Sequence, residues 1–322
     1  MTANVTFTNG KAEMAYVGDT PWWGGGNRLT VGAPIEKWIP EAGMDWRIRR
    51  SLVRYISDAQ GTTHTMDDQH VLFRSDTKAP LGLVSPKYKT VQPRDVLEFF
   101  RDLVEGNGYT LETAGTLFGG KRFWATAAVG EEAVIVGSDQ LKPYLMLATS
   151  CDGSLATTAR FVTVRPVCSN TLNMALAGKA HEVVVKHTSH FVAEEVKEKL
   201  GLARGAFREF ILATRQLAAA KVATTTAETF VANLLKDQKL VFKEDVTKTR
   251  QFMTIMNLFE SGVGADLAAA NGTAWGLVNA VTEFVDHHAR AQSIENRAVS
   301  AMWGRGDVLK TEAMQRALAL AA

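Results

Sequence analysis

Cationic and aromatic residues lie close together along two short stretches in the middle of the chain, and they are the residues best suited to chemistry. The candidates are Lys121, Arg122, Phe123 and Trp124 in the first stretch, Arg160, Phe161 and Arg165 in the second, and Lys186 and His187 beyond it. Side chains of a strand alternate between its two faces, so Lys121 shares a face with Phe123, Arg122 with Trp124, and Arg165 with Phe161. Cations that neutralise phosphates beside rings that stack on bases suit single-stranded nucleic acid. Solvated charges opposite core aromatics give the same pattern, so the residues alone leave both interpretations open.

A glycine-rich segment resembles a phosphate-binding loop only in part. Residues 115–121 match the first seven positions of that motif, but Arg122 stands where the motif has Ser or Thr. The following residues, 123–127, have the composition of a strand, whereas the motif needs a helix whose N-terminus faces the phosphates. We therefore expect no nucleotide hydrolysis.

Histidines and cysteines give no metal or nucleophile signature. His181, His187 and His190 lie close together in sequence, but their spacing matches no zinc pattern. Cys151 and Cys168 are too few for a disulfide framework and fit a reducing cytosol. Neither cysteine lies in a protease or nucleophile-elbow motif. We expect no metal, no cofactor and no catalytic residue.

Composition indicates a globular protein without a strong overall charge. The 322 residues are 46% hydrophobic, and 36 Lys and Arg against 34 Asp and Glu give a net charge of +2. This balance excludes a uniformly basic protein, but it allows one basic face. The N-terminus lacks the features of a signal peptide, and no apolar run approaches the roughly 20 residues that span a bilayer. We expect a soluble, cytoplasmic protein with no membrane partner.

The order of elements predicts an α+β fold: an antiparallel β-sheet and β-hairpin core packed on helices, followed by a C-terminal helical subdomain. Residues 1–50 form an arm rich in tryptophan and glycine, residues 51–188 the α+β core, and residues 189–322 the helical subdomain. Strands are expected at 51–56, 70–74, 109–117, 122–129, 144–151 and 156–167, and helices at 95–104, 189–200, 204–220, 228–235, 246–260, 274–288 and 309–320. Alternation within the last strand puts Arg160 and Arg165 on opposite faces.

Three local signals refine the helix boundaries. The polar residues 168–171 look like the entrance to a helix. Thr225 and Glu228 have the spacing of a capping box, and Asp307 is a plausible N-cap.

Several motifs, taken in order, resemble one family. They are residues 15–22 (AYVGDTPW), 150–154 (SCDGS), 165–172 (RPVCSNTL), 186–188 (KHT) and 275–283 (WGLVNAVTE). Together they are similar to the phage/plasmid-like proteins of the domain of unknown function 932 family. Trp23, Cys151 and Pro166 depart from the residues usual in that family.

The resemblance implies a remote relation to single-strand annealing recombinases of the eukaryotic Rad type. Such proteins form rings or filaments, bind single-stranded DNA in a groove lined by a β-hairpin sheet and a helix, and anneal strands without nucleotide hydrolysis. It implies a phage- or plasmid-encoded protein that acts as a homo-oligomer on single-stranded DNA in the bacterial host, with a possible replication or recombination partner. The nine cationic and aromatic candidates would then form the nucleic-acid surface, and the aromatic arm and C-terminal helices would join the subunits.

Two other functions stay open. One is a phage- or plasmid-encoded protein–protein interaction factor that does not bind nucleic acid. The other is a nucleic-acid enzyme that uses Asp152 and Glu182 with a metal ion.

Overall fold

The computed structural model describes residues 6–8, 10–18, 25–57, 59, 61–130, 132–165, 167–168, 170–174, 182–201, 206–238, 240 and 245–322. The chain groups into two compact units, each built from separate segments. The first unit contains residues 1–130, 145–160 and 182–201, and the second contains residues 131–144, 161–181 and 202–322. The three-part division expected from the sequence stays a prediction, and Trp22 and Trp23 of the expected arm lie outside the described residues.

A mainly antiparallel sheet forms the core of the first unit. Its strands are β3 (Met14–Val17), β4 (Asn27–Leu29), β8 (Thr110–Leu117), β9 (Arg122–Ala128) and β14 (Glu182–Val185), with the first-unit residues of β11 (Gln140–Ser150) and β12 (Thr157–Arg165). The order is β12-β11-β9-β8-β3-β4, and β14 pairs with the beginning of β12. Strand β9 follows the glycine-rich segment directly, as expected: residues 115–117 end β8, and a 3₁₀ turn at Phe118–Gly120 connects the hairpin, so the segment leads into no α-helix.

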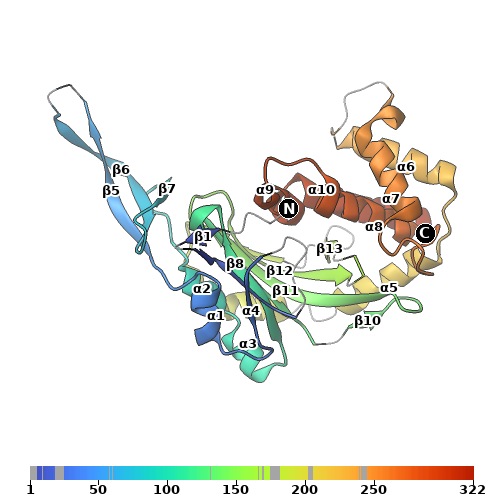
Figure 1. The fold of residues 1–322 in the computed structure, drawn as a ribbon, viewed down its shortest axis with the longest axis horizontal. Coiled ribbons are helices and arrows are strands. Elements are labelled where there is room, and N and C mark those ends of the chain that lie inside the picture. Colours follow the sequence, from blue (N-terminus) through green and yellow to red (C-terminus); the bar gives the residue numbers. More distant parts are fainter. Residues whose placement is uncertain are drawn as a thin grey trace. The chain divides into compact units, whose positions relative to one another are not determined.

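A second sheet of the first unit consists of β5 (Ile48–Ile56), β6 (Thr63–Arg74) and β7 (Pro80–Val84) in that order. Strands β5 and β6 form a long hairpin that extends away from the larger sheet (Figure 1). Most of β5 and the first half of β6 are exposed. A short pair, β1 (Phe7–Thr8) and β2 (Lys11–Ala12), completes the strands described in this unit.

The described residues of the first unit form four α-helices: α1 (Ile35–Glu41), α2 (Pro93–Glu98), α3 (Arg101–Gly106) and α4 (Ala193–Gly201). The helix expected over residues 95–104 is broken between α2 and α3. Phe99 and Phe100 lie at this break, are buried and contact each other edge to face, with ring centroids 5.1 Å apart. Helix α2 begins with Pro93, and Gln92 and Asp95 form a reciprocal capping box there.

The second unit is mainly helical. It contains α5 (Ala206–Ala219), α6 (Thr224–Asp237), α7 (Arg250–Ser261), α8 (Ala274–Glu283), α9 (Ile294–Trp303) and α10 (Arg305–Ala321), with the short strands β10 (Ala133–Val134) and β13 (Asn170–Asn173). Every residue of α8 is buried, and α5, α7 and α10 pack around it. A 3₁₀ turn at Val246–Lys248 precedes α7, and a π-helical turn at Phe284–His288 ends α8.

Two buried ion pairs tie strands to helices within the second unit. Arg165 donates from Nε to Asp139 Oδ1 at 2.7 Å and from Nη2 to Asp139 Oδ2 at 2.8 Å. Trp275 Nε1 also donates to Asp139 Oδ2, at 3.3 Å. Lys310 Nζ donates to Asp286 Oδ1 at 2.8 Å and to the Thr171 carbonyl at 2.6 Å. Because both pairs are almost fully buried, each charge depends on its partner for solvation.

The α+β class is confirmed, with mixed sheets and a predominance of helix toward the C-terminus. Three local expectations are wrong. Residues 170–173 form strand β13, because their backbone pairs with β12 and therefore does not start a helix. Helix α6 begins at Thr224 after Ala223, without a side-chain cap, and Asp307 lies in the first turn of α10 behind the N-cap Gly304. Among the described helices, none is long and apolar enough to span a membrane.

Candidate nucleic-acid interface

The aromatic residues expected to stack on bases lie in the core. Phe123, Trp124 and Phe161 are all buried. Phe123 contacts Trp46 edge to face, with ring centroids 5.9 Å apart. These rings are therefore held by packing on both faces of their strands, and the expected contacts with bases are not supported by this arrangement.

The arginines of the same stretches are buried as well. Arg122 is 7% exposed and donates from Nη2 to Ser154 Oγ at 2.8 Å. Burial lowers the pKa of its guanidinium, although the nearby Asp152 carboxylate opposes that shift. Arg160 is 4% exposed and lies opposite Glu182 in the β12–β14 pairing. Arg165 is committed to Asp139 and to the Gly264 carbonyl at 3.0 Å. The alternation argument from the sequence allowed for one solvated face, whereas both faces of these strands are buried here.

Lys121, Lys186 and His187 are the expected site residues that keep exposed surface. Lys121 and His187 are partly exposed, and Lys186 is exposed. The structure brings Lys186 and His187 to a second basic loop, residues 86–89, which the sequence had not singled out as a site. The backbone N–H of Lys89 donates to the His187 carbonyl, and this bond joins the two loops.

The side chain of His187 fixes this junction. Its ring stacks on Tyr88, with centroids 4.5 Å apart and an interplanar angle of 17°. Its Nδ1 lies 3.1 Å from the Lys89 carbonyl oxygen, and its Nε2 lies 2.9 Å from the Leu155 carbonyl oxygen. The loop at residues 150–155 is thereby held in place, since the Tyr88 hydroxyl also donates to the Ser150 carbonyl at 2.9 Å. Burial raises the pKa of Tyr88 well above its usual value, so the phenol stays neutral.

Arg50, at the base of the hairpin, completes the arrangement. Its guanidinium donates to the Tyr88 carbonyl at 2.6 Å and to the Pro86 carbonyl at 3.4 Å. We name the resulting surface the basic loop cluster: Arg50, Lys87, Tyr88, Lys89, Lys186 and His187. Within the described part of the chain, its four Arg and Lys side chains form no ion pair with a carboxylate, and all four are exposed. Exposed cations that form no ion pair, beside a stacked aromatic pair, can bind phosphates and a base plane.

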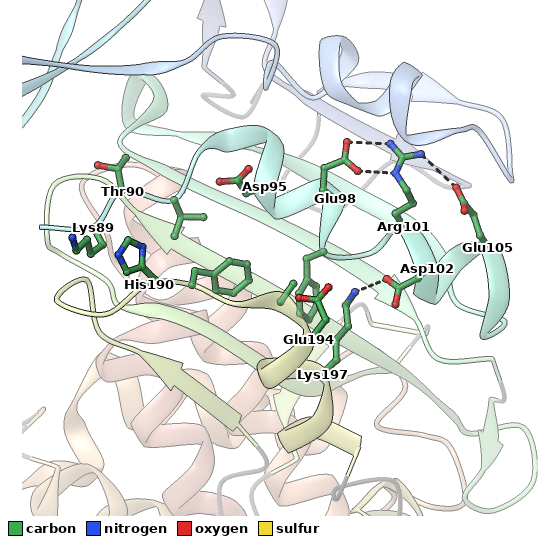
Figure 2. Close-up of a pocket in the computed structure, with 14 residues that line it drawn as sticks. Lys89, Thr90, Asp95, Glu98, Arg101, Asp102, Glu105, His190, Glu194 and Lys197 are labelled. Atoms are coloured by element: carbon green, nitrogen blue, oxygen red, sulfur yellow. Dashed lines mark hydrogen bonds and ion pairs between the residues drawn. The ribbon is translucent and has the colours of Figure 1, made fainter.

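A pocket of about 750 Å³ adjoins this cluster at Lys89 and His190 (Figure 2). Helices α2, α3 and α4 supply most of its wall, and carboxylates outnumber cations there. Glu98 pairs with Arg101 at 2.6 Å, and Asp102 pairs with Lys197. The side-chain bond from Arg101 lowers the pKa of Glu98, which therefore stays ionised. An anionic wall repels phosphate, so a nucleic acid would follow the loops and avoid the pocket.

The β5–β6 hairpin offers a second exposed surface in the first unit. Tyr55 and His64 lie opposite each other and stack at 5.3 Å, and Arg54 is exposed beside them. Large apolar side chains are also exposed on it, including Ile56 at 67%. Such a surface suits contact with another macromolecule.

Sequence reasoning missed Arg50 and residues 87–89, although the run Pro86-Lys87-Tyr88-Lys89 carries the same mixture of cation and aromatic. Only the fold reveals that it meets residues 186–187.

Among the described residues, no group of three His, Cys, Asp or Glu side chains could hold a metal ion. Cys151 and Cys168 are both free thiols.

Comparison with known proteins identifies the family. No curated protein and no solved structure matches the chain. Residues 80–303, more than half of the chain, match the family described as Domain of unknown function (DUF932). This segment includes the loops at residues 86–89 and 186–187, whereas Arg50 and the β5–β6 hairpin precede it. The chain therefore belongs to the DUF932 family.

Proposed function

We propose that this protein binds single-stranded DNA and anneals complementary strands as an oligomer, without nucleotide hydrolysis. The observation that carries the proposal is the basic loop cluster, where the exposed lysines Lys87, Lys89 and Lys186 are sequence neighbours of the stacked residues Tyr88 and His187. This site replaces the buried strand residues as the proposed phosphate-binding surface. A phage- or plasmid-encoded origin and action in the bacterial cytoplasm belong to the same proposal.

The geometry of the cluster suits a flexible polyanion. Its three lysines lie on loops whose backbones are fixed by the bonds of His187 and of Arg50, a residue of strand β5, so binding requires little ordering of the protein. Contacts of its cations with phosphates carry no sequence information, so the binding is largely independent of sequence. Four cations on a single strand give a salt slope approaching about −3, at roughly −0.7 per phosphate.

Assembly is proposed to use exposed apolar surface. Leu52, Tyr55, Ile56 and Met66 expose between 42% and 67% of their surface along the β5–β6 hairpin. Burial of these side chains against another subunit would remove apolar area from water. The hairpin is thus a better-supported joint than the N-terminal arm, whose Trp38 and Trp46 are buried within the first unit.

The test is a titration of a fluorescent single-stranded oligonucleotide, followed by anisotropy. The variant Lys87→Gln, Lys89→Gln, Lys186→Gln removes three exposed charges and should weaken binding at least tenfold at low salt. A matched control removes three exposed lysines elsewhere, Lys37→Gln, Lys199→Gln and Lys236→Gln. Equal affinities of the two triple variants would contradict the site, and no binding by the folded wild type at low salt would contradict the function.

The second candidate function is a protein–protein interaction factor, and the exposed apolar hairpin is the observation that favours it. Under this alternative, Ile56→Ser combined with Leu52→Ser abolishes self-association or partner binding, while the protein shows no affinity for DNA at any salt concentration. Light scattering of the wild type and this double variant, beside the DNA titration, separates the two functions.

A further inference from the structure

The second unit contains a cavity of about 760 Å³ whose charged lining residues are all basic in character. Arg250, Arg290, Arg297, Arg305 and His288 line it, and no Asp or Glu is among its lining residues. It is formed by the first turns of α7 and α10, by α9, and by the segment that follows α8. We name it the arginine cavity. Every element that forms it belongs to the second unit.

None of the four arginines that line the cavity forms an ion pair with a carboxylate in the part of the chain that the structure describes. Arg297 is held in place by two backbone carbonyls, with Nη1 2.8 Å from the His287 oxygen and Nε 3.1 Å from the Ala289 oxygen. Its Nη2 group has no acceptor among the described residues. A fixed guanidinium with free donors is prepared to bind an oxyanion.

The carboxylate that pairs with the lining residue His288 does little to offset this charge. Glu283 Oε1 lies 3.9 Å from His288 Nε2, and the Glu283 side chain is only 7% exposed. Burial raises the pKa of Glu283, which favours its neutral form. The wall therefore keeps an excess of positive charge.

Two helix N-termini add to the positive potential. Arg250 begins α7 and Arg305 begins α10, and Gln251 and Gly306 from the same first turns also line the cavity. The N-terminus of a helix carries a partial positive charge and attracts phosphate. The N-cap of α10 is Gly304, which has no side chain, and Ser300 Oγ accepts a hydrogen bond from the Gly306 N–H of that end at 3.3 Å.

The rest of the lining is apolar and sized for a small molecule. Phe284, Val285 and Leu309 contribute to it. A volume of this size falls in the range of small-molecule sites, and an apolar wall beside oxyanion donors suits a phosphate attached to an organic group. Four arginines converging on one cavity favour the doubly charged terminal phosphate over the single charge of a phosphodiester.

We propose that the arginine cavity binds the terminal phosphate of a nucleoside phosphate. A free nucleotide and the 5′-phosphorylated end of a DNA strand share this chemistry. The inference goes beyond the proposed strand annealing and does not depend on the basic loop cluster, which belongs to the other unit.

The test is isothermal titration calorimetry of the full chain with deoxyadenosine 5′-monophosphate and with deoxyadenosine. The nucleotide should bind at least tenfold more tightly than the nucleoside. Arg250→Gln combined with Arg305→Gln should weaken nucleotide binding at least tenfold, whereas the control Arg208→Gln, an exposed arginine of α5, should leave it unchanged. Both substituted arginines are exposed, so circular dichroism should show the native helix content in the variant.

Two oligonucleotides that differ only in a 5′-phosphate distinguish the sources. Tighter binding of the phosphorylated strand, lost in the double variant, supports recognition of a strand end, and nucleotide binding without that preference supports a free nucleotide. The proposal is overturned if neither the nucleotide nor the 5′-phosphate binds through the two arginines. The triple lysine variant of the basic loop cluster should keep nucleotide binding, so failure of strand binding and failure of the cavity give separate results.

Discussion

Arg165 was expected to contact DNA, but its buried hydrogen bonds indicate that it stabilises the fold. We predict that Arg165→Met destabilises the protein without weakening DNA binding by the folded molecules. The guanidinium makes two bonds to Asp139 at 2.7 and 2.8 Å and one to the Gly264 carbonyl at 3.0 Å. Asp139 is fully buried, so removal of Arg165 leaves its carboxylate without its ionic partner in the interior. Breaking a buried pair in this way typically costs about 3 to 5 kcal/mol of the free energy of unfolding.

Urea unfolding followed by circular dichroism measures this loss. A suitable control is Arg316→Met, which removes a partly exposed arginine paired with Glu312 and Asp237 and should cost no more than about 1 kcal/mol. Adding Asp139→Asn to Arg165→Met removes the stranded charge and should recover part of the stability. A loss below about 1 kcal/mol for Arg165→Met, or a native-like stability with a large loss of DNA affinity, would refute the scaffold role.

Two further predictions concern buried ionisable groups. Lys310→Met leaves Asp286 buried without its cation and strips a donor from the Thr171 carbonyl, so it should lower the free energy of unfolding by about 3 to 5 kcal/mol; a melting temperature equal to that of the wild type would contradict this role. Burial raises the pKa of the Cys151 thiol to about 12, from 9.0, so the folded state holds this proton more tightly than the unfolded state. Its contribution to stability is complete below pH 9 and is lost as the pH rises toward about 12, and Cys151→Ala should flatten that part of the stability–pH curve; an unchanged curve would contradict the assignment. In the native protein at pH 8, Cys151 should also react slowly with a thiol reagent, and it should react quickly after unfolding.

The sequence predicted most of the elements because their signals are local. The hairpin of β8 and β9 follows from β-branched and aromatic residues around a glycine turn, and α5 and α7 follow from helical periodicity. The break after Glu98 was not foreseen, because it depends on Phe99 and Phe100 packing together in the core. The helix entrance expected at residues 168–171 failed for a similar reason, since pairing with β12 overrides the local cap signal.

The site could be predicted only in part. Lys186 and His187 were found from their residue types, but Lys87, Tyr88 and Lys89 become partners of these residues only when the two loops meet. The opposite error was made for Arg122 and Phe123, where strand alternation suggested one solvated face. Layers on both faces of β9 bury every one of its residues, and no periodicity in a single strand reveals a second layer.

The salt dependence of single-stranded DNA binding tests the central claim most directly. With four cations of the basic loop cluster engaged, the wild type should lose about 50-fold in affinity between roughly 50 and 200 mM salt. The variant Lys87→Gln, Lys89→Gln, Lys186→Gln should bind weakly at low salt and lose only about threefold over the same range. A wild-type affinity that does not change with salt, or a triple variant with the wild-type slope, would contradict the account.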